Sequence, residues 1–180
     1  NPKAATFVGT AISKWDTASA TTLHYTFAGA REMNADLSGW KVAKVVTLEQ
    51  TFRDASKFTG TGLSAWDTAS ATSLYLTFDG ASVLNADLTG WKVAKVVTLK
   101  WTFSGASKFT GTGLSAWDTA SATSLYGTFF YASEMNADLS GWKVGKVVTL
   151  YETFSSASKF TATGLSAWDT ASATSLSNTF

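Results

Sequence analysis

The sequence predicts an α/β repeat solenoid of about seven coils, each with a short helix and a short extended segment that ends in a turn. Three observations support this prediction. Tryptophan recurs at intervals of 25 and 26 residues, Thr-Phe pairs recur at the same intervals, and the apolar spacing around each pair is that of one helix face. The periodic tryptophans are Trp15, Trp40, Trp66, Trp91, Trp117, Trp142 and Trp168.

Residues 1–180 form a single array in which two unit types alternate, so the true period is 51 residues. Both termini fall in the middle of a unit, and we therefore expect the chain to be part of a longer array. Exposed coil ends could also stack chains end to end. The units end near Phe27, Phe52, Phe78, Phe103, Phe129, Phe154 and Phe180.

The helix prediction rests on the segment from Leu48 to Ala55. Its apolar or small residues Leu48, Thr51, Phe52 and Ala55 follow the i, i+3, i+4, i+7 pattern of a helix face. Thr47 precedes them as a possible N-cap, and a hydroxyl residue stands at this position in every unit. Thr, Phe and intruding Gly residues are mediocre helix formers, so we expect only about two or three turns, partly 3₁₀.

The other half of each unit predicts the extended segment and the turn. In residues 36–42, Leu37 and Trp40 are three positions apart, which breaks strict strand alternation and favours a bend or bulge. A coil this small cannot bury its own large side chains, so stacking must create a continuous core of Trp, Phe and Leu. The residue after each Trp alternates between Asp and Lys, which predicts a charge ladder with each Asp between two Lys.

Composition excludes several classes of function. The net charge is +1 and only 15% of residues are charged, which argues against a nucleic-acid partner. The chain has no Cys and one His, so disulfides, thiolate metal sites and Ser-His-Asp or Cys-His catalysis lack their residues. No apolar run approaches the roughly 20 residues of a membrane span. We expect a non-enzymatic protein without a cofactor, a metal site or a membrane span in this segment.

The repeat resembles a known family. Residues 33–40 read Met-Asn-Ala-Asp-Leu-Ser-Gly-Trp, and residues 46–55 supply Val-Thr-Leu, Thr-Phe and Ala. This is similar to the bacterial surface-protein repeat of 25 to 26 residues, a relative of the BspA-like leucine-rich repeats, whose pattern is roughly Phe-Asn-x-Asp-Leu-Ser-x-Trp-Asp-Val-Ser-x-Val-Thr-x-Met-x-x-Met-Phe-x-x-Ala. Here Leu and Thr replace the two Met residues of that pattern, and alternate units read Phe-Thr-Gly-Thr-Gly at its start.

The resemblance implies a leucine-rich-repeat-like solenoid with an extracellular or cell-surface location. It also implies recognition or adhesion roles, and it brings no catalytic residues.

Variation between units is concentrated in short windows on either side of each Thr-Phe pair. These windows hold all five Tyr, the single His and both Arg of the chain, which are residue types favoured at binding surfaces. If Leu48 and Phe52 face inward, the window residues face solvent and form one continuous patch. The predicted ligand-binding residues are His24, Tyr25, Arg31, Glu49, Gln50, Arg53, Asp54, Tyr75, Asp79, Lys100, Trp101, Tyr126, Phe130, Tyr131, Tyr151 and Glu152.

We therefore expect a recognition or adhesion module whose ligand is a protein or a glycan. A structural, ice-binding or surface-layer protein is the alternative, because Thr59 and Thr61 recur every 51 residues and would form regular ranks. Ice binding favours a flat uniform face, however, and only every second unit has this Thr pair. An artificial array of consensus repeats is a third possibility.

Overall fold

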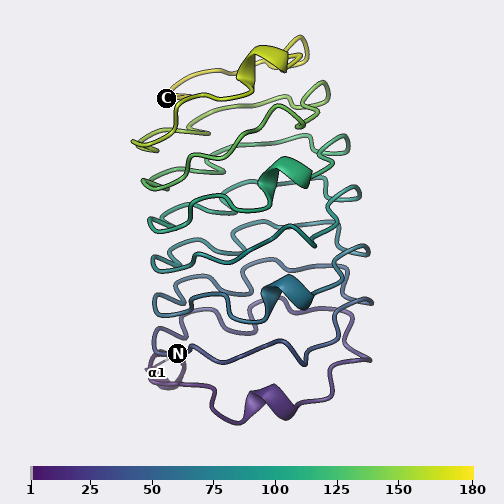
Figure 1. Cartoon of the computed structure of the whole chain (residues 1–180), viewed down its shortest axis with the longest axis vertical. Helices are drawn as coiled ribbons and strands as arrows, with labels where there is room; N and C mark the ends of the chain where they lie inside the picture. Colours follow the sequence, from purple (N-terminus) through teal and green to yellow (C-terminus); the bar gives the residue numbers. More distant parts are fainter. Residues whose placement is uncertain (1) are drawn as a thin grey trace.

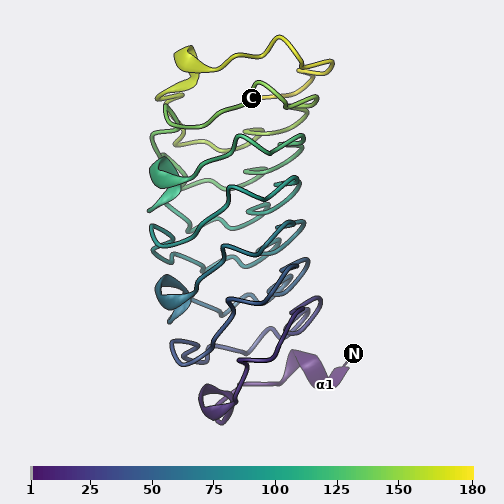
Figure 2. The same cartoon turned by 90° about the vertical axis from the view of Figure 1, so that its right-hand side faces the viewer.

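The computed structural model describes residues 2–180 and shows a stack of coils, one for each 25- or 26-residue unit (Figures 1 and 2). Regular secondary structure is sparse. One short α-helix, α1, spans Pro2–Ala5, and four 3₁₀ helices recur in alternate coils. These are η1 (Ile12–Lys14), η2 (Leu63–Ala65), η3 (Leu114–Ala116) and η4 (Leu165–Ala167). The tandem-repeat organisation is thus visible directly in the structure.

The predicted α/β solenoid with one helix and one strand per coil is wrong, and so is its leucine-rich-repeat-like version. Within residues 2–180 the structure contains no β-strand, and no helix lies in the segments around the Thr-Phe pairs. Neighbouring coils are joined instead by isolated parallel bridges between the hydroxyl residues, such as Thr47 to Ser73 and Ser73 to Thr98. The hydroxyl of Thr47 accepts the N–H of Glu49, so it closes a local turn and caps no helix.

Consecutive β-turns replace the predicted helix. The N–H of Thr51 donates to the carbonyl of Leu48 at 3.1 Å, and the N–H of Ala55 donates to that of Phe52 at 3.0 Å. The third residue of each turn, Gln50 and then Asp54, has a positive φ of 53° and 57°, as in a type II turn. Two consecutive turns place the side chains of residues i, i+3, i+4 and i+7 on the same side of the chain. This is also the spacing of a helix face, which is why the sequence pattern predicted a helix.

Hydrogen bonds between coils explain why turns are preferred here. The N–H of Gln50 donates to the carbonyl of Tyr75 at 2.9 Å, and the N–H of Phe52 donates to that of Thr77 at 2.9 Å. An α-helix that begins at Leu48 would bond the Phe52 N–H, and those of the residues after it, to carbonyls of the same segment, so these groups could not join one coil to the next. The stack therefore fixes both the turn geometry and the register.

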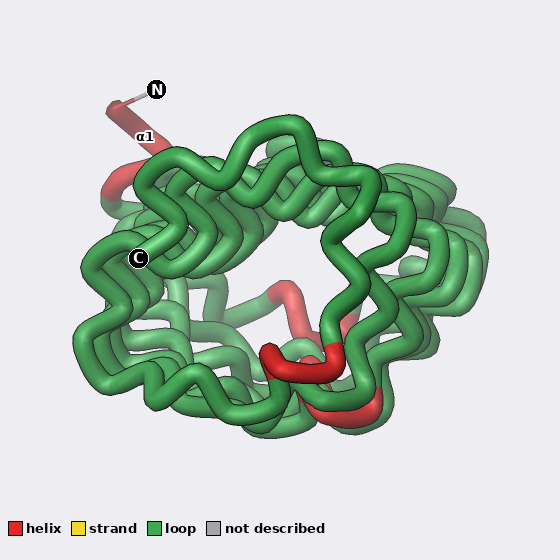
Figure 3. Tube along the Cα trace, turned by 90° about the horizontal axis from the view of Figure 1, so that it is seen from above, coloured by secondary structure: helices red, strands yellow, loops and turns green. Residues whose placement is uncertain are grey.

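The coils superimpose when the chain is seen along the stack (Figure 3), and aromatic columns fill the interior that they surround. Trp66 and Trp91 stack with their ring centroids 6.2 Å apart and their planes 4° from parallel, and Phe52 and Phe78 stack at 5.5 Å. The indole N–H of Trp91 donates to the carbonyl of Leu63 in the preceding coil at 2.9 Å. The indole N–H is thus hydrogen-bonded while the rings pack in the core. The predicted core column of Trp, Phe and Leu is confirmed.

A column of buried threonines runs beside the phenylalanines. The hydroxyl of Thr102 is within 2.8 Å of the carbonyl of Leu99 and 2.9 Å of the carbonyl of Leu74, one coil earlier. Thr102 is completely buried, so this hydroxyl is a polar connection between coils inside an apolar core.

Glycine is required where the constant loop enters each 3₁₀ helix. Gly62 precedes η2 with a φ of 91°, and an added Cβ would lie 2.1 Å from the backbone nitrogen of Ser38. No side chain fits at that distance. The Thr-Gly-Thr-Gly sequence therefore lets adjacent coils approach closely.

The charge ladder forms in only one direction. Lys92 pairs with Asp67 at 3.3 Å, and Lys143 pairs with Asp118 at 3.1 Å. Asp67 and Asp118 thus have one Lys partner each instead of the two that were expected. These exposed pairs contribute about 0–1 kcal/mol each.

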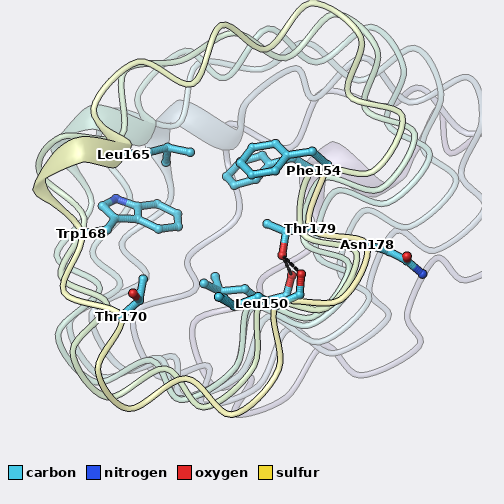
Figure 4. A pocket seen from close by; sticks show the side chains of 9 residues that line it. Leu150, Phe154, Leu165, Trp168, Thr170, Asn178 and Thr179 are labelled. Atoms are coloured by element: carbon cyan, nitrogen blue, oxygen red, sulfur yellow. Dashed lines mark hydrogen bonds between the residues drawn. The ribbon is translucent and has the colours of Figure 1, made fainter.

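The last coil leaves part of the core open, as Figure 4 shows from close by. The opening has a volume of about 410 Å³, and Leu150, Phe154 and Trp168 are among the side chains that line it. Thr179 donates its hydroxyl to the carbonyl of Leu150 across this opening. Its apolar lining continues the aromatic and leucine columns of the core.

The buried threonine column gives a first prediction. Thr102→Val keeps the shape of the side chain but removes the hydroxyl that hydrogen-bonds the carbonyls of Leu99 and Leu74. The free energy of unfolding should therefore fall by about 1–2 kcal/mol. The Thr123 hydroxyl also donates to a carbonyl of the preceding coil, that of Val97, but it does so at the exposed surface, where water can replace it. Val stands at the matching position of the neighbouring coils, so Thr123→Val should change the free energy of unfolding by less than about 0.5 kcal/mol. Urea denaturation measures both variants, and equal effects would contradict the role given to Thr102.

The left-handed turn residues give a second prediction. Glu152 has a φ of 55°, which costs a residue with a Cβ about 1–2 kcal/mol, whereas glycine has no such penalty. After the greater chain entropy of unfolded glycine is subtracted, Glu152→Gly should be about 0.5–1 kcal/mol more stable than Glu152→Ala. Both variants remove the same carboxylate, so their difference in denaturation midpoint reports the backbone alone. Greater stability of the alanine variant would exclude the left-handed turn.

Candidate binding surface

The variable windows lie at the corners of the β-turns, outside the core, and we call their residues together the variable face. Trp101 and Tyr126 are half-buried, whereas Phe103 and Leu125 beside them in sequence are fully buried in the core. Leu48, like Phe103, faces inward as predicted. The stack sets these corners side by side in successive coils, so the variable face is continuous.

The backbone at these corners is left-handed in every coil. At these corners the residue with positive φ is the second of each window pair, and most of these residues carry a Cβ. Trp101 has a φ of 57° and Tyr131 one of 55°, in a region that L-residues other than Gly, Asn and Asp rarely occupy. The first such column consists of Tyr25, Gln50, Leu76, Trp101, Gly127, Glu152 and Asn178, and the second of Gly29, Asp54, Gly80, Gly105, Tyr131 and Ser156.

Five rings in the second half of the variable face form the aromatic cluster: Trp101, Tyr126, Phe130, Tyr131 and Tyr151. The Trp101 ring centroid lies 4.8 Å from that of Tyr126 and 5.3 Å from that of Phe130. Tyr126 meets Tyr151 edge-on at 4.9 Å, and Phe130 meets Tyr131 edge-on at 4.4 Å. These contacts hold the rings against one another while Tyr131 stays 56% exposed.

Two further residues shape the aromatic cluster. The ammonium of Lys100 lies 4.7 Å from the ring centroid of Tyr126 and 5.9 Å from that of Tyr75, within cation–π range. Gly127 makes room for the indole of Trp101, because an added Cβ would lie 2.2 Å from its ring. The pKa of Tyr126 is raised, mainly by burial and also by the nearby Glu152 carboxylate.

The first half of the variable face carries a polar cluster centred on Arg53. The amide of Gln50 donates to the Tyr25 hydroxyl at 2.6 Å, and its oxygen accepts from Arg53 at 3.0 Å. The guanidinium Nε of Arg53 lies 3.5 Å from Asp79 and 3.8 Å from Asp54. Gln50 is only 6% exposed and lies under the other side chains of this cluster. The prediction that Gln50 faces solvent is therefore wrong.

Burial raises the pKa of Asp79, against the opposing effects of the Ser104 hydroxyl and the Arg53 guanidinium. Asp54 raises it further through charge repulsion. The side chain of Asp79 is thus held in place by neighbours from two other coils.

The edge of the polar cluster is formed by His24 and Glu49. The His24 ring lies 4.3 Å from that of Tyr25, and its Nε2 is 3.9 Å from a Glu49 oxygen. The Ser73 hydroxyl donates to the other Glu49 oxygen at 2.7 Å. Arg31 is exposed, and among residues 2–180 its side chain forms no hydrogen bond or ion pair with either cluster.

Most of the predicted site residues therefore fall into two groups that lie side by side along the stack. Leu76, Gly127 and Ser104 were missed as contributors. The signal that could have found them is the glycine at second window positions such as 80, 105 and 127, since recurrent glycine beside variable residues indicates a left-handed corner.

The variable face offers groups for non-covalent contacts with a ligand. No group of three or more His, Cys, Asp or Glu side chains is placed to hold a metal ion anywhere in the described part of the chain. In the same residues, no helix is long and apolar enough to cross a bilayer. Ring faces, ring edges, hydroxyls and a few charges are what a ligand would meet.

Comparison with known proteins gives a family. The model of the family described as "Mycoplasma protein of unknown function, DUF285" matches residues 2–91 and again residues 72–180. No curated protein and no solved structure matches the chain. The two matches overlap and together span the array, which agrees with its tandem repeats. The chain therefore belongs to the DUF285 family.

Proposed function

We propose that this chain is a non-enzymatic recognition module that presents the variable face to a protein or glycan ligand. The observation that carries this proposal is the presence of large side chains at left-handed turn corners. Tyr25, Trp101 and Tyr131 have φ values of 59°, 57° and 55°. Glycine at these positions would remove the strain of the left-handed backbone conformation. Each such residue costs about 1–2 kcal/mol.

Strain of this kind is concentrated at functional sites in proteins. Solvent-facing corners gain little stability from a Trp or Tyr, whereas ligand binding gains from rings that are already fixed in position. The edge-on contacts of Tyr126 with Tyr151 and of Phe130 with Tyr131 provide that order. Aromatic residues of this type dominate the binding energy of many interfaces.

A cell-surface or extracellular location and an adhesion role belong to the same proposal. They rest on the resemblance of the repeat to BspA-like bacterial surface repeats, which is a finer assignment than membership of DUF285. Varied residues on a repeated frame suit a protein that must meet different external ligands.

The alternative of an ice-binding or surface-layer structure has weaker support. The hydroxyl of Thr59 lies 3.1 Å from that of Thr61 and donates to the side-chain oxygen of Asn34 at 2.9 Å. These hydroxyls are therefore engaged with neighbours. The coils between the Thr pairs present Asn34 and Asp36 instead, which interrupts a uniform face. A thermal hysteresis measurement separates the two proposals.

Removing four of the five rings of the aromatic cluster tests the proposal. Serine at Trp101, Tyr126, Phe130 and Tyr131 should abolish binding to whichever member of a panel of immobilised glycans and extracellular proteins the native chain captures. The coil stack should remain folded, because none of these rings belongs to the core. Serine at Val46, Val97 and Val148, which are each 47% exposed and lie outside the variable windows, is the matched control. Unchanged affinity of the four-serine variant would refute the proposal.

A single methyl group provides a subtler test. Gly127→Ala places a Cβ against the indole of Trp101 and should weaken binding about tenfold or more without removing any aromatic ring. Gly145→Ala is the control, because its Cβ has room and Ala stands at the matching positions 43 and 94. Biolayer interferometry against the same captured ligand compares the two variants. Equal affinities would show that the position of Trp101 does not matter to binding.

A further inference from the structure

A second surface, formed by constant residues, carries the same pocket twice. One pocket of about 450 Å³ is lined by residues 39–43, and another of about 580 Å³ is lined by the corresponding residues 90–94. We call them the corner pockets, since both surround a Gly-Trp-Lys-Val-Ala turn. Both volumes are in the range of small-molecule sites. None of the lining residues belongs to the variable windows.

Each corner pocket combines an apolar floor with polar walls. In the larger pocket, Val93 and Ala94 form part of the apolar surface and Thr89 adds a hydroxyl. Lys92 and Lys95 supply ammonium groups, and Asp118 from the following coil completes the wall. A sugar ring has the same mixture of C–H surface and hydroxyl groups.

The charges along this edge do not cancel completely. Lys92 is paired with Asp67, and Asp118 with Lys143, so the carboxylates are already neutralised. Lys95, like its equivalents Lys44 and Lys146, is exposed and forms no ion pair among residues 2–180. An ammonium without an ion pair therefore recurs at this position in each 51-residue period.

We propose that this edge binds an acidic polysaccharide that carries one carboxylate per disaccharide, with one disaccharide seated at each corner pocket. Lys95 lines the larger pocket, and Lys44 and Lys146 stand at the same sequence position in the other periods. These three ammonium groups receive the carboxylates, and the two pockets receive sugar rings. This site lies on a different surface from the variable face and is independent of the recognition function proposed above.

The period of the array favours a polymer over a single small ligand. Two coils rise by about 10 Å, because hydrogen-bonded neighbouring backbones lie about 4.8 Å apart. That is the length scale of two linked sugar rings in an extended chain. Two pockets one period apart let one polymer occupy both, which strengthens binding by multivalency even when each pocket binds weakly.

The probe is hyaluronate, in which a uronic acid alternates with an uncharged sugar, and its binding is measured by isothermal titration calorimetry. Glutamine at Lys44, Lys95 and Lys146 should weaken its binding about tenfold or more. The charge-matched control is Lys57→Gln, Lys108→Gln and Lys159→Gln, because this second lysine row recurs with the same period and its loss removes the same net charge, although Lys57 and Lys159 are paired with Glu32 and Glu134. The control variant should lose less than about threefold in affinity, as expected for long-range charge alone.

Two ligand controls complete the experiment. Affinity should rise with hyaluronate length as one, two and three disaccharides are offered, and polyglutamate of equal charge should bind at least about tenfold more weakly. Equal losses in the two lysine variants, or equal binding of polyglutamate or DNA, would show nonspecific charge attraction and overturn the proposal, as would no binding of hyaluronate. The four-serine variant of the variable face should bind hyaluronate like the native chain, so the two proposals fail separately.

Discussion

The structure depends on one constraint, which is that backbone N–H groups pointing along the stack must find carbonyls in the next coil. The donation from Gln50 to Tyr75 and that from Phe52 to Thr77 show the pattern. A chain that meets this requirement within a 25- or 26-residue coil has to turn sharply and often. The turns, their left-handed corners and the inward direction of Leu48 and Phe52 all follow from it.

The same constraint couples each variable residue to its neighbours in adjacent coils. Gly127 lies against Trp101, and Gly80 lies against Asp54, where an added Cβ would be 2.7 Å from the carboxylate oxygen. At these two points a glycine of one coil thus makes room for the larger side chain of the preceding coil. The variable face is a packed surface whose residues fix one another in place, and this order suits a surface that binds ligands.

The sequence alone was sufficient for the repeat, the core columns and the inward position of Leu48 and Phe52, because these follow from periodicity. It could not distinguish a helix from consecutive β-turns, since both place residues at i, i+3, i+4 and i+7 on one side. Gln50 carries no visible mark of its left-handed backbone, and its burial depends on Tyr25 and Arg53 from the surrounding surface. The variable windows were nevertheless located correctly, because a helix and a turn both place residues such as Trp101 outside the core.

The most direct measurement detects the hydrogen bonds themselves, as scalar couplings across N–H···O=C in an isotope-labelled sample. The structure predicts that the amide nitrogen of Phe52 couples to the carbonyl carbon of Thr77, 25 residues later in the chain. A coupling from Phe52 to Leu48, four residues earlier, would instead reveal a helix. That result would contradict the turn architecture and, with it, the strained corners from which a recognition role is inferred.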